Sequence, residues 1–335
     1  MSILIVQQPD VPPLLPMSEC IEIMEDALKT LARGGALMPL RGHLWLPEKV
    51  GELTMMPAYL GDIGVLGLKV ITYFPGNWGT EFDTHQGGVM LYEEKHGSLL
   101  AIIDATEITA IRTAAVTAVA TRVLARENAS DLAILGSGTQ ARVHLESMLL
   151  ARDIKRVRVW SLPLRQATEF AEVNSKRHGV PVQAMPTAAE CVEGADIICT
   201  NTSAKEPILE GDWISPGTHV NAVGSTIPHT RELDTRAVLI SKMFCDRRES
   251  CLNEAGDFLF PKKEGAIGDD HVRGEIGDIL IGKIKGRESA GEITMFKSLG
   301  LAIEDVAAAY HVYKKAKKLG VGTWVDLGGK RHTDG

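Results

Sequence analysis

The spacing of apolar side chains predicts a different structure for each of three stretches in the first 125 residues. Residues 17–31 place apolar side chains three and four positions apart, which predicts a helix with Ser18 as its N-cap. Residues 36–105 hold short apolar runs between turns rich in Gly, Pro and Asp, which predicts strands and hairpins. Residues 109–125 contain many small side chains and neither Gly nor Pro, so we expect a tightly packed helix.

From residue 131 the pattern alternates between strands and helices. The run DLAILGSG predicts a strand, TQARVHLESMLLAR a helix, KRVRVWS a second strand and RQATEFAEVNSKRHG a second helix. This order is typical of a parallel α/β sheet, and a long amphipathic helix closes the chain. We therefore expect an α/β protein with a strand-rich α+β domain at 1–123 and a Rossmann-type, doubly wound nucleotide domain at 124–309. A C-terminal helix at 310–335 is expected to pack back on the first domain.

A glycine turn joins the first predicted strand of the second domain to its helix. Gly136 permits a tight turn, Gly138 lets the backbone approach a pyrophosphate, and Ala141 allows the helix to pack closely on the sheet. The free N–H groups at the helix start, around Thr139 and Gln140, favour a phosphate. The GxGxxA pattern in this place predicts a dinucleotide site. The alternative is a purely structural strand–helix turn.

The residue after the second strand of this domain bears on the choice of dinucleotide. An Asp or Glu at this place accepts hydrogen bonds from the ribose of NAD and repels the 2′-phosphate of NADP. Here Ser161 stands at this place, and Arg165 follows shortly after it. The pattern mildly favours NADP(H) over NAD(H). The alternative for Arg165 is a solvated charge at a helix start.

Composition and charge restrict the class of protein. The 335 residues are 44% hydrophobic and 24% charged with a formal net charge of −7, which argues against a nucleic acid or an anionic membrane as partner. No apolar run approaches the ~20 residues that span a membrane. Five cysteines stand without a CxxC pair, and the N-terminus lacks the basic region of a secretory signal. We therefore expect a cytoplasmic protein with reduced thiols.

Three cations interrupt apolar surroundings. Lys69 lies inside the strand-like run VLGLKVITYF, where it faces either the core or water. Arg41 precedes a predicted strand, and an ordinary surface arginine is its alternative. Arg112 is expected in the first turn of a helix of Ala, Thr, Val and Ile, where the guanidinium and the helix dipole both attract anions. This position favours a bidentate clamp on a carboxylate.

Other polar residues are candidates for a cofactor site. His85 and Gln86 flank a turn, where they either face a cofactor or cap a loop. Thr200, Asn201 and Thr202 end the fourth strand of the second domain, at the edge where nicotinamide binds in such domains. The sequence contains no HExxH, GxSxG or P-loop lysine motif, so metal and nucleophilic chemistry are not expected.

Five segments across the chain share a pattern with a known family. They are ITAIRTAAVTAVAT (108–121), LAILGSGTQARVH (132–144), VNAVGS (220–225), RELD (231–234) and FKSLGLAIED (296–305). In this order they resemble the ornithine cyclodeaminase/μ-crystallin family, and FKSLG resembles its ketimine reductase members. The resemblance implies a homodimer whose N-terminal domain binds substrate and forms the subunit contact through its sheet. It also implies a nicotinamide cofactor between the domains, and a clamp of Arg41, Lys69 and Arg112 on the α-carboxylate of an amino or imino acid.

Two positions depart from the cyclodeaminase pattern. Thr226 stands where those enzymes have an aspartate that works on the substrate amine, and its role here is open. Thr54 stands where they have a glutamate that reaches the distal amine of ornithine. Neither threonine can act as a carboxylate, so ornithine cyclodeamination is disfavoured. The resemblance and the glycine turn together predict these cofactor contacts: Thr84, His85, Gln86, Arg112, Thr113, Gly136, Gly138, Thr139, Gln140, Ser161, Arg165, Thr200, Asn201, Thr202, Val223, Gly224, Ser225, Lys297 and Ser298.

The predicted activity is NAD(P)H-dependent reduction of α-imino acids to amino acids. The substrates would be cyclic ketimines, such as pyrroline-2-carboxylate or piperideine-2-carboxylate, or imines formed from α-keto acids and amines. The alternatives are an alanine dehydrogenase, an ornithine or lysine cyclodeaminase, and a non-catalytic NADP-dependent carrier of small ligands. Candidates for the side-chain pocket, each with core or loop packing as its alternative, are Met55, Met56, Tyr73, Trp78 and His229.

Overall fold

The structure is a computed structural model that describes residues 2–329. Within these residues the chain forms two compact units: unit 1 comprises residues 2–112 and 301–329, and unit 2 comprises residues 113–300. The first division lies within helix α3 (Ala105–Leu124), and the second lies just before helix α11 (Ala302–Leu319). From the sequence we expected these divisions at 123/124 and 309/310.

Unit 1 is built on a mixed sheet of eight strands. The order is β16-β1-β7-β6-β5-β4-β2, and β3 pairs with a further part of β4. Among the described strands of this sheet only β1 and β7 pair in parallel. The antiparallel pairs from β4 to β7 confirm the series of strands and hairpins expected between residues 36 and 105. The strands are β1 (Ser2–Val6), β2 (Ala36–Leu37), β3 (Gly42–Trp45), β4 (Glu52–Leu60), β5 (Val65–Tyr73), β6 (His85–Glu93), β7 (Leu99–Asp104) and β16 (Thr323–Asp326).

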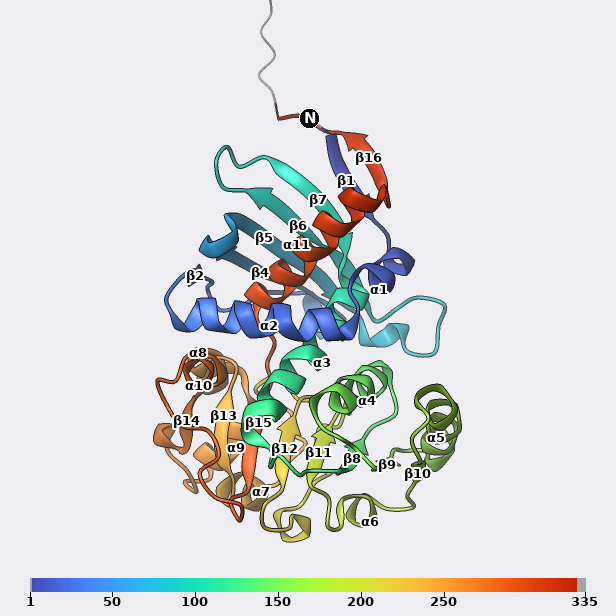
Figure 1. The fold of residues 1–335 in the computed structure, drawn as a ribbon, viewed down its shortest axis with the longest axis vertical. Coiled ribbons are helices and arrows are strands. Elements are labelled where there is room, and N and C mark those ends of the chain that lie inside the picture. The colour runs from blue at the N-terminus through green and yellow to red at the C-terminus, as the bar shows by residue number, and fades with distance from the viewer. Residues whose placement is uncertain (1, 330–335) are drawn as a thin grey trace, which may run out of the picture. The chain divides into compact units, whose positions relative to one another are not determined.

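Helix α11 covers one face of this sheet. It lies across the strands and also packs on α2 (Met17–Ala32), next to the short helix α1 (Val11–Leu14), as Figure 1 shows. An added Cβ at Gly67 in β5 would lie 2.4 Å from Val306 Cγ2, so the glycine lets the helix approach the strand closely. The closing helix α11 therefore packs on the sheet and on α2 within unit 1.

Two expectations about helix ends in unit 1 are wrong. The C-terminal helix was expected at 310–335, but α11 ends at Leu319 and residues 323–326 form β16, which pairs with β1. Residues 330–335 lie outside the described part of the chain. Ser18 is not the N-cap of α2, because Pro16 takes that position and the helix begins at Met17. Proline already has a φ compatible with the helix start, so the helix begins before the serine.

Helix α3 begins earlier than expected, which changes the surroundings of Arg112. The helix starts at Ala105 directly after β7, and Thr106 N donates to Asp104 Oδ1 at 2.8 Å. Arg112 therefore lies in the third turn, not in the first. Since the helix dipole acts mainly over the first turn, it does not add to the anion attraction of Arg112 as predicted. Carboxylates of α11 replace it as the main electrostatic partners, as described below.

Unit 2 is a doubly wound sheet of eight parallel strands, which confirms the expected fold class. The order is β10-β9-β8-β11-β12-β15-β13-β14. Its direction reverses between β8 and β11, and ligands of such sheets bind at the carboxyl ends of the strands at this point. The strands are β8 (Asp131–Leu135), β9 (Arg156–Trp160), β10 (Val182–Ala184), β11 (Ile197–Thr200), β12 (His219–Ala222), β13 (Lys242–Cys245), β14 (Val272–Glu275) and β15 (Thr294–Lys297).

Short helices and a continuous apolar core complete unit 2. Buried side chains of the sheet and of the covering helices form one cluster, to which Leu135, Val220, Met243 and Phe258 belong. No helix among residues 2–329 is long and apolar enough to cross a membrane. The helices are α4 (Thr139–Ala151), α5 (Leu164–His178), α6 (Ala188–Val192), α7 (Thr235–Leu239), α8 (Arg248–Glu254), α9 (Gly256–Lys263) and α10 (Ile276–Leu280).

Replacement of Gly67 by alanine tests the close approach of α11 to the sheet. The added methyl group would meet Val306, a stiff side chain, so we expect Gly67→Ala to lower the free energy of unfolding by about 1–3 kcal/mol. Gly291→Ala is the matched control, because nothing lies within 4 Å of an added Cβ there. Urea unfolding followed by circular dichroism measures both, and equal midpoints for the two variants would contradict the packing described.

Candidate functional site

Two cations predicted from the sequence meet two carboxylates inside unit 1. Lys69 Nζ lies 2.7 Å from Asp305 Oδ2, and Arg112 Nε donates to Asp305 Oδ1 at 2.9 Å. Arg112 Nη1 also donates to Glu304 Oε2 at 2.8 Å. Lys69 is 1% exposed and Arg112 4% exposed, so these contacts form away from bulk water. We call Lys69, Arg112, Glu304 and Asp305 the ion cluster.

Electrostatic interactions join Lys69 to the third predicted cation. Burial lowers the pKa of Lys69 to about 8, Asp305 opposes this shift, and the charges of Arg112 and Arg41 add to it. Arg41 therefore acts on the same ammonium group as the ion cluster does. The three cations predicted from the sequence are thus electrostatically coupled, as a clamp on a carboxylate requires.

Sequence reasoning missed Glu304 and Asp305, although it quoted the segment that contains them. The signal was a pair of acidic residues at the start of an otherwise apolar helix, AIEDVAAA. Both side chains are fully buried, and buried carboxylates require cationic partners. A search for the cations that could pair with them would have led to Lys69 and Arg112.

The predicted residues Thr84, His85 and Gln86 lie at the start of β6. Thr84 Oγ1 lies 3.0 Å from His85 Nδ1, and Gln86 Nε2 donates to Asp83 O at 3.0 Å. The His85 ring lies 4.7 Å from the ring of Tyr73 in the neighbouring strand. Desolvation lowers the pKa of His85, Asp83 opposes this shift, and the positive charge of Lys69 adds to it. The charge of Lys69 in the ion cluster therefore acts on the ring of His85.

The glycine turn of unit 2 has the shape that a pyrophosphate needs. Gly136 adopts a φ of +119°, and an added Cβ would lie 2.5 Å from Asn201 O, so only glycine fits. Gly138 has open space where its Cβ would be. It is also the N-cap of α4 and offers no side chain, so the first N–H groups of the helix have no side-chain cap. These groups are available for an anion.

Buried polar atoms without partners surround this turn. Within the described residues, no hydrogen-bond partner is found for Gln140 Oε1, Ser161 Oγ, or the side-chain amide of Asn201. These atoms lie near the carboxyl ends of β8, β9 and β11, at the reversal of strand order. Orphaned polar atoms are rare in a finished core, so their clustering fits a bound polar ligand. A dinucleotide has the hydroxyl, phosphate and amide groups that would pair with them.

Glu232 ties together the loops that follow β11 and β12. Its fully buried carboxylate accepts hydrogen bonds from Thr200 Oγ1 at 2.6 Å and from Thr202 N at 2.7 Å. It also accepts from Thr202 Oγ1 at 2.6 Å and from Gly224 N at 2.8 Å. An added Cβ at Gly224 would lie 2.5 Å from this carboxylate. Sequence reasoning quoted RELD but gave Glu232 no role; it fixes the positions of three predicted contacts, Thr200, Thr202 and Gly224.

Most of the remaining predicted residues of unit 2 lie at the carboxyl ends of the strands. Lys297 is fully buried, donates to Ala222 O at 3.0 Å and pairs with Asp257 at 3.0 Å, so its charge is already compensated inside the unit. Ser298 N donates to Ala222 O, and Ser225 Oγ donates to Thr230 O at 2.6 Å. Other positions are Val223 and Thr226 after β12, Thr113 buried within α3, and Thr139 at the start of α4.

Two further predictions concern specificity. Arg165 lies in the first turn of α5 with 80% of its side chain exposed, and it pairs with Glu169 one turn later.

The candidates for the side-chain pocket lie at several places. Tyr73 lies beside His85, Met56 is the strand partner of Lys69 in β4, and Met55 is exposed. Trp78 and His229 are exposed loop residues. None of these positions is tested by a bound ligand, so all stay predictions.

The chain matches a known protein family along nearly its whole length. The model of the "Ornithine cyclodeaminase/mu-crystallin family" matches residues 1–320. The chain is 38% identical over 293 residues to the ketimine reductase mu-crystallin of Mus musculus, which covers 87% of this chain and 90% of that protein.

Solved structures show the same relationship. The Δ1-pyrroline-2-carboxylate reductase of Thermococcus litoralis, in complex with NADH and L-proline, is 39% identical with a TM-score of 0.93, covering 96% of this chain and 99% of that one. An archaeal alanine dehydrogenase dimer with bound NAD is 34% identical with a TM-score of 0.93, covering 98% and 100%. With a family model that matches nearly its whole length, this chain belongs to the ornithine cyclodeaminase/mu-crystallin family.

Proposed function

We propose that this protein is an NAD(P)H-dependent reductase that converts α-imino acids to amino acids. The observation that carries the proposal is the ion cluster, in which Glu304 and Asp305 hold the buried cations of Lys69 and Arg112 side by side. The names of the similar proteins agree with it, since they include a pyrroline-2-carboxylate reductase and a ketimine reductase. Cyclic ketimines, and imines of α-keto acids with amines, are the substrate class.

In this mechanism the protein contributes position and charge. Arg112 and Lys69, held by Asp305 and Glu304, bind the α-carboxylate, which fixes the adjacent C=N carbon. Because water is largely excluded from these side chains, their attraction for the carboxylate is stronger than at an exposed site. A bound nicotinamide supplies the hydride. A protonated iminium is already electrophilic, so little further acid assistance is needed.

The cofactor contacts are proposed for unit 2. The turn at Gly136–Gly138 and the start of α4 would hold the pyrophosphate, while Gln140, Ser161 and Asn201 would pair with other polar groups of the dinucleotide. NADP(H) is mildly favoured, because no carboxylate follows β9 and Arg165 is free to turn toward a 2′-phosphate from an exposed position. The relatives solved with NADH and NAD support use of the unphosphorylated cofactor as well.

Alanine dehydrogenase activity is a second candidate. It is favoured by the likeness to the archaeal alanine dehydrogenase, and it uses the same carboxylate clamp with the imine of pyruvate as intermediate. The carrier alternative has less support, because a cluster that fixes a carboxylate beside a reacting carbon has little use in a protein that only binds.

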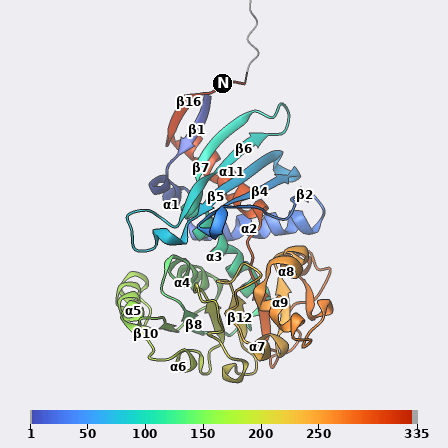
Figure 2. The ribbon, with the colours of Figure 1, turned by 180° about the vertical axis from the view of Figure 1, so that it is seen from behind.

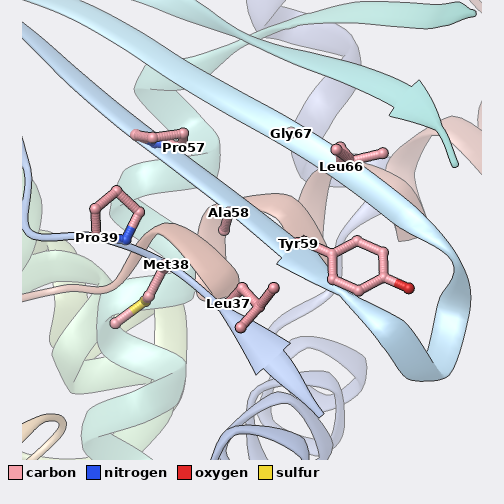
Figure 3. A pocket seen from close by; sticks show the side chains of 8 residues that line it. All are labelled: Leu37, Met38, Pro39, Pro57, Ala58, Tyr59, Leu66 and Gly67. Carbon is pink, nitrogen blue, oxygen red and sulfur yellow. The ribbon is translucent and has the colours of Figure 1, made fainter. Parts of the chain in front are cut away.

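We propose that the protein is a homodimer that forms through the face of the unit 1 sheet opposite α11. On this face β3, β4 and β5 carry apolar side chains, and Figure 2 shows strands β4–β7 in front of α11. A shallow groove of about 400 Å³ continues the surface between β2 and β5, as Figure 3 shows. Sheet faces of this kind stack on a partner, and one similar structure is named a dimer. The exposed apolar residues include Leu37, Leu44, Met55 and Leu66.

We also place the protein in the cytoplasm. Its five cysteines, which all lie in the described part of the chain, are unpaired and buried. Unpaired thiols in such number fit a reducing compartment.

The proposed activity is tested by a panel of imines with NADPH and NADH. We expect oxidation of the reduced cofactor with pyrroline-2-carboxylate, piperideine-2-carboxylate, or pyruvate with ammonia or methylamine, followed at 340 nm. Arg112→Lys keeps the charge but loses the fork geometry, so we expect the KM of the imine to rise about tenfold or more, which is ~1.4 kcal/mol. No turnover with any imine and either cofactor would overturn the proposal. Ligand binding that is unchanged in this variant, together with absent turnover, would favour the carrier.

The pH dependence of this reaction reports on Lys69. Its pKa is lowered to about 8, so the charged form that binds a carboxylate is lost as the pH rises through this value, and kcat/KM should fall there. Asp305→Asn removes an anion that raises this pKa, so the fall should move to lower pH. Lys69→Arg stays charged and should abolish it. The titration of the imine itself is the same for all variants, so a difference between variants in the pH at which kcat/KM falls reports on Lys69. An alkaline limb that is identical in all three proteins would contradict this assignment.

A charged side chain on the sheet face opposite α11 tests the proposed dimer. Leu66→Glu places a carboxylate on the exposed apolar surface, and we expect it to yield a folded monomer at micromolar concentration by light scattering after gel filtration. Val173→Glu is the control, because Val173 is an exposed side chain of α5 in unit 2, and it should leave the dimer intact. A wild-type monomer, or a dimer of unchanged stability in Leu66→Glu, would contradict the proposal.

A further inference from the structure

A second polar pair lies on the sheet face that carries Lys69. Glu52 in β4 is 7% exposed, and its Oε2 accepts a hydrogen bond from His43 Nδ1 at 2.7 Å. Thr54 Oγ1 lies 3.3 Å from the same nitrogen, and the His43 ring stacks on Trp45 with 6.0 Å between centroids. None of these contacts belongs to the ion cluster. We call His43 and Glu52 the distal pair.

Strand register places the distal pair and Lys69 on one face. Met56 pairs with Lys69, and Glu52 and Thr54 follow Met56 at two-residue intervals back along β4. His43 pairs with Thr54, so it belongs to the same face. Side chains at two-residue intervals point to the same side of a sheet. The face that binds α11 at Gly67 therefore continues past Lys69 to Thr54, His43 and Glu52.

Helix α11 covers only part of this face. Its first turns bring Asp305 to Lys69, and Val306 covers Gly67. Beyond Lys69, Ile71 and Tyr73 of β5 are half-buried, and 29% of the His43 side chain is exposed. This part of the face therefore keeps partly exposed side chains beside Glu52 and Thr54, which are 7% and 5% exposed. Lys69 lies at one end of it and the carboxylate of Glu52 at the other.

The electrostatics of His85 agree with this arrangement. The charge of Lys69 lowers the pKa of His85, whereas that of Glu52 raises it. Both charges therefore act on one ring, although they belong to different strands. His85 pairs with Tyr73, which pairs with Glu52, so the three residues form one row across β4, β5 and β6.

The dimensions suit a small imino acid. The row of His43 and Thr54 lies two residues along the sheet from the row of Lys69, which is about 7 Å. A carboxylate carbon and the far atom of a five- or six-membered ring are three to four bonds apart, which is roughly 4–5 Å. A ligand whose carboxylate binds the ion cluster would therefore direct its far end toward the distal pair.

We propose that His43 and Glu52 form the distal end of the substrate subsite and select imino acids that carry a hydrogen-bond donor, a hydroxyl or an ammonium group, at the far end of the ring or chain. The inference rests on the proposed function. A donor there gains a charge-assisted hydrogen bond to Glu52, whereas a second carboxylate would be repelled by it. Glu52 lies two residues before Thr54 on the same face of β4, so its carboxylate is near the place that Thr54 occupies.

A set of ring-substituted prolines tests this subsite. L-Proline is compared with 4-hydroxy-, 4-amino- and 4-carboxy-L-proline, each in both diastereomers, as substrates for oxidation by NAD⁺ and NADP⁺. The measured quantity is the ratio of kcat/KM for the substituted ring to that for L-proline. The hydroxyl and amino arms distinguish the two kinds of donor, and the carboxy arm tests the repulsion.

Variants of the distal pair give the expected changes. In Glu52→Gln we expect the ratio for the better hydroxyl or amino diastereomer to fall about tenfold, and the ratio for the carboxy compound to rise. His43→Gln should change the ratios in the same direction and provides a second variant if Glu52→Gln folds poorly. Glu48→Gln is the matched control, since Glu48 is exposed in the loop between β3 and β4, and it should leave every ratio unchanged.

The outcomes separate this inference from the proposed function. Ratios that are the same in wild type, Glu52→Gln and His43→Gln would overturn the subsite while turnover of L-proline upholds the reductase. If no proline or imine is turned over, the proposed function fails. In that case the dissociation constants of the same prolines are measured by tryptophan fluorescence with the oxidised cofactor present. The ratio of each dissociation constant to that of L-proline, compared between wild type and the variants, then tests the subsite.

Discussion

The pairing of Lys69 and Arg112 with two carboxylates of α11 is the interaction on which this account depends. A lysine or an arginine without a partner would be costly at this depth, and removal of one member of such a cluster leaves the others uncompensated. Because Asp305 bonds to both cations, it fixes their distance from each other. Gly67 contributes to this, since its missing side chain lets α11 approach the strand that carries Lys69. The fold of unit 1 therefore holds the two cations at fixed positions, which is what the proposed carboxylate clamp requires.

Unit 2 achieves a similar precision with hydrogen bonds. Glu232 collects donors from the loops after β11 and β12, and Asp246 accepts from Leu299 N and Gly300 N after β15. Burial raises the pKa of Glu232, the nearby charge of Asp257 adds to this, and the hydroxyl groups of Thr200 and Thr202 oppose it. The strand ends around the glycine turn are thus fixed by buried acids, whereas Gln140, Ser161 and Asn201 have buried polar atoms without a hydrogen-bond partner among the described residues.

Local patterns predicted much of this fold, because each depends on neighbours in sequence. The alternation of strands and helices after residue 131, the strand series before 105 and the place of the glycine turn are determined by periodicity and turn residues. Contacts between segments that lie far apart in the sequence cannot be predicted from such local patterns. The partners of Arg112 lie 192 and 193 positions away, so a helix dipole was expected instead of Glu304 and Asp305.

The most direct test of the central claim is a crystal structure of the protein with L-proline and the oxidised cofactor. The account predicts that the carboxylate of the ligand lies within hydrogen-bond distance, about 3 Å, of Lys69 and Arg112, with Arg41 close to it. The guanidinium of Arg112 would still bond to Asp305. A carboxylate bound elsewhere, or Lys69 and Arg112 turned away from the ligand, would contradict the account even if the nucleotide lies at the glycine turn.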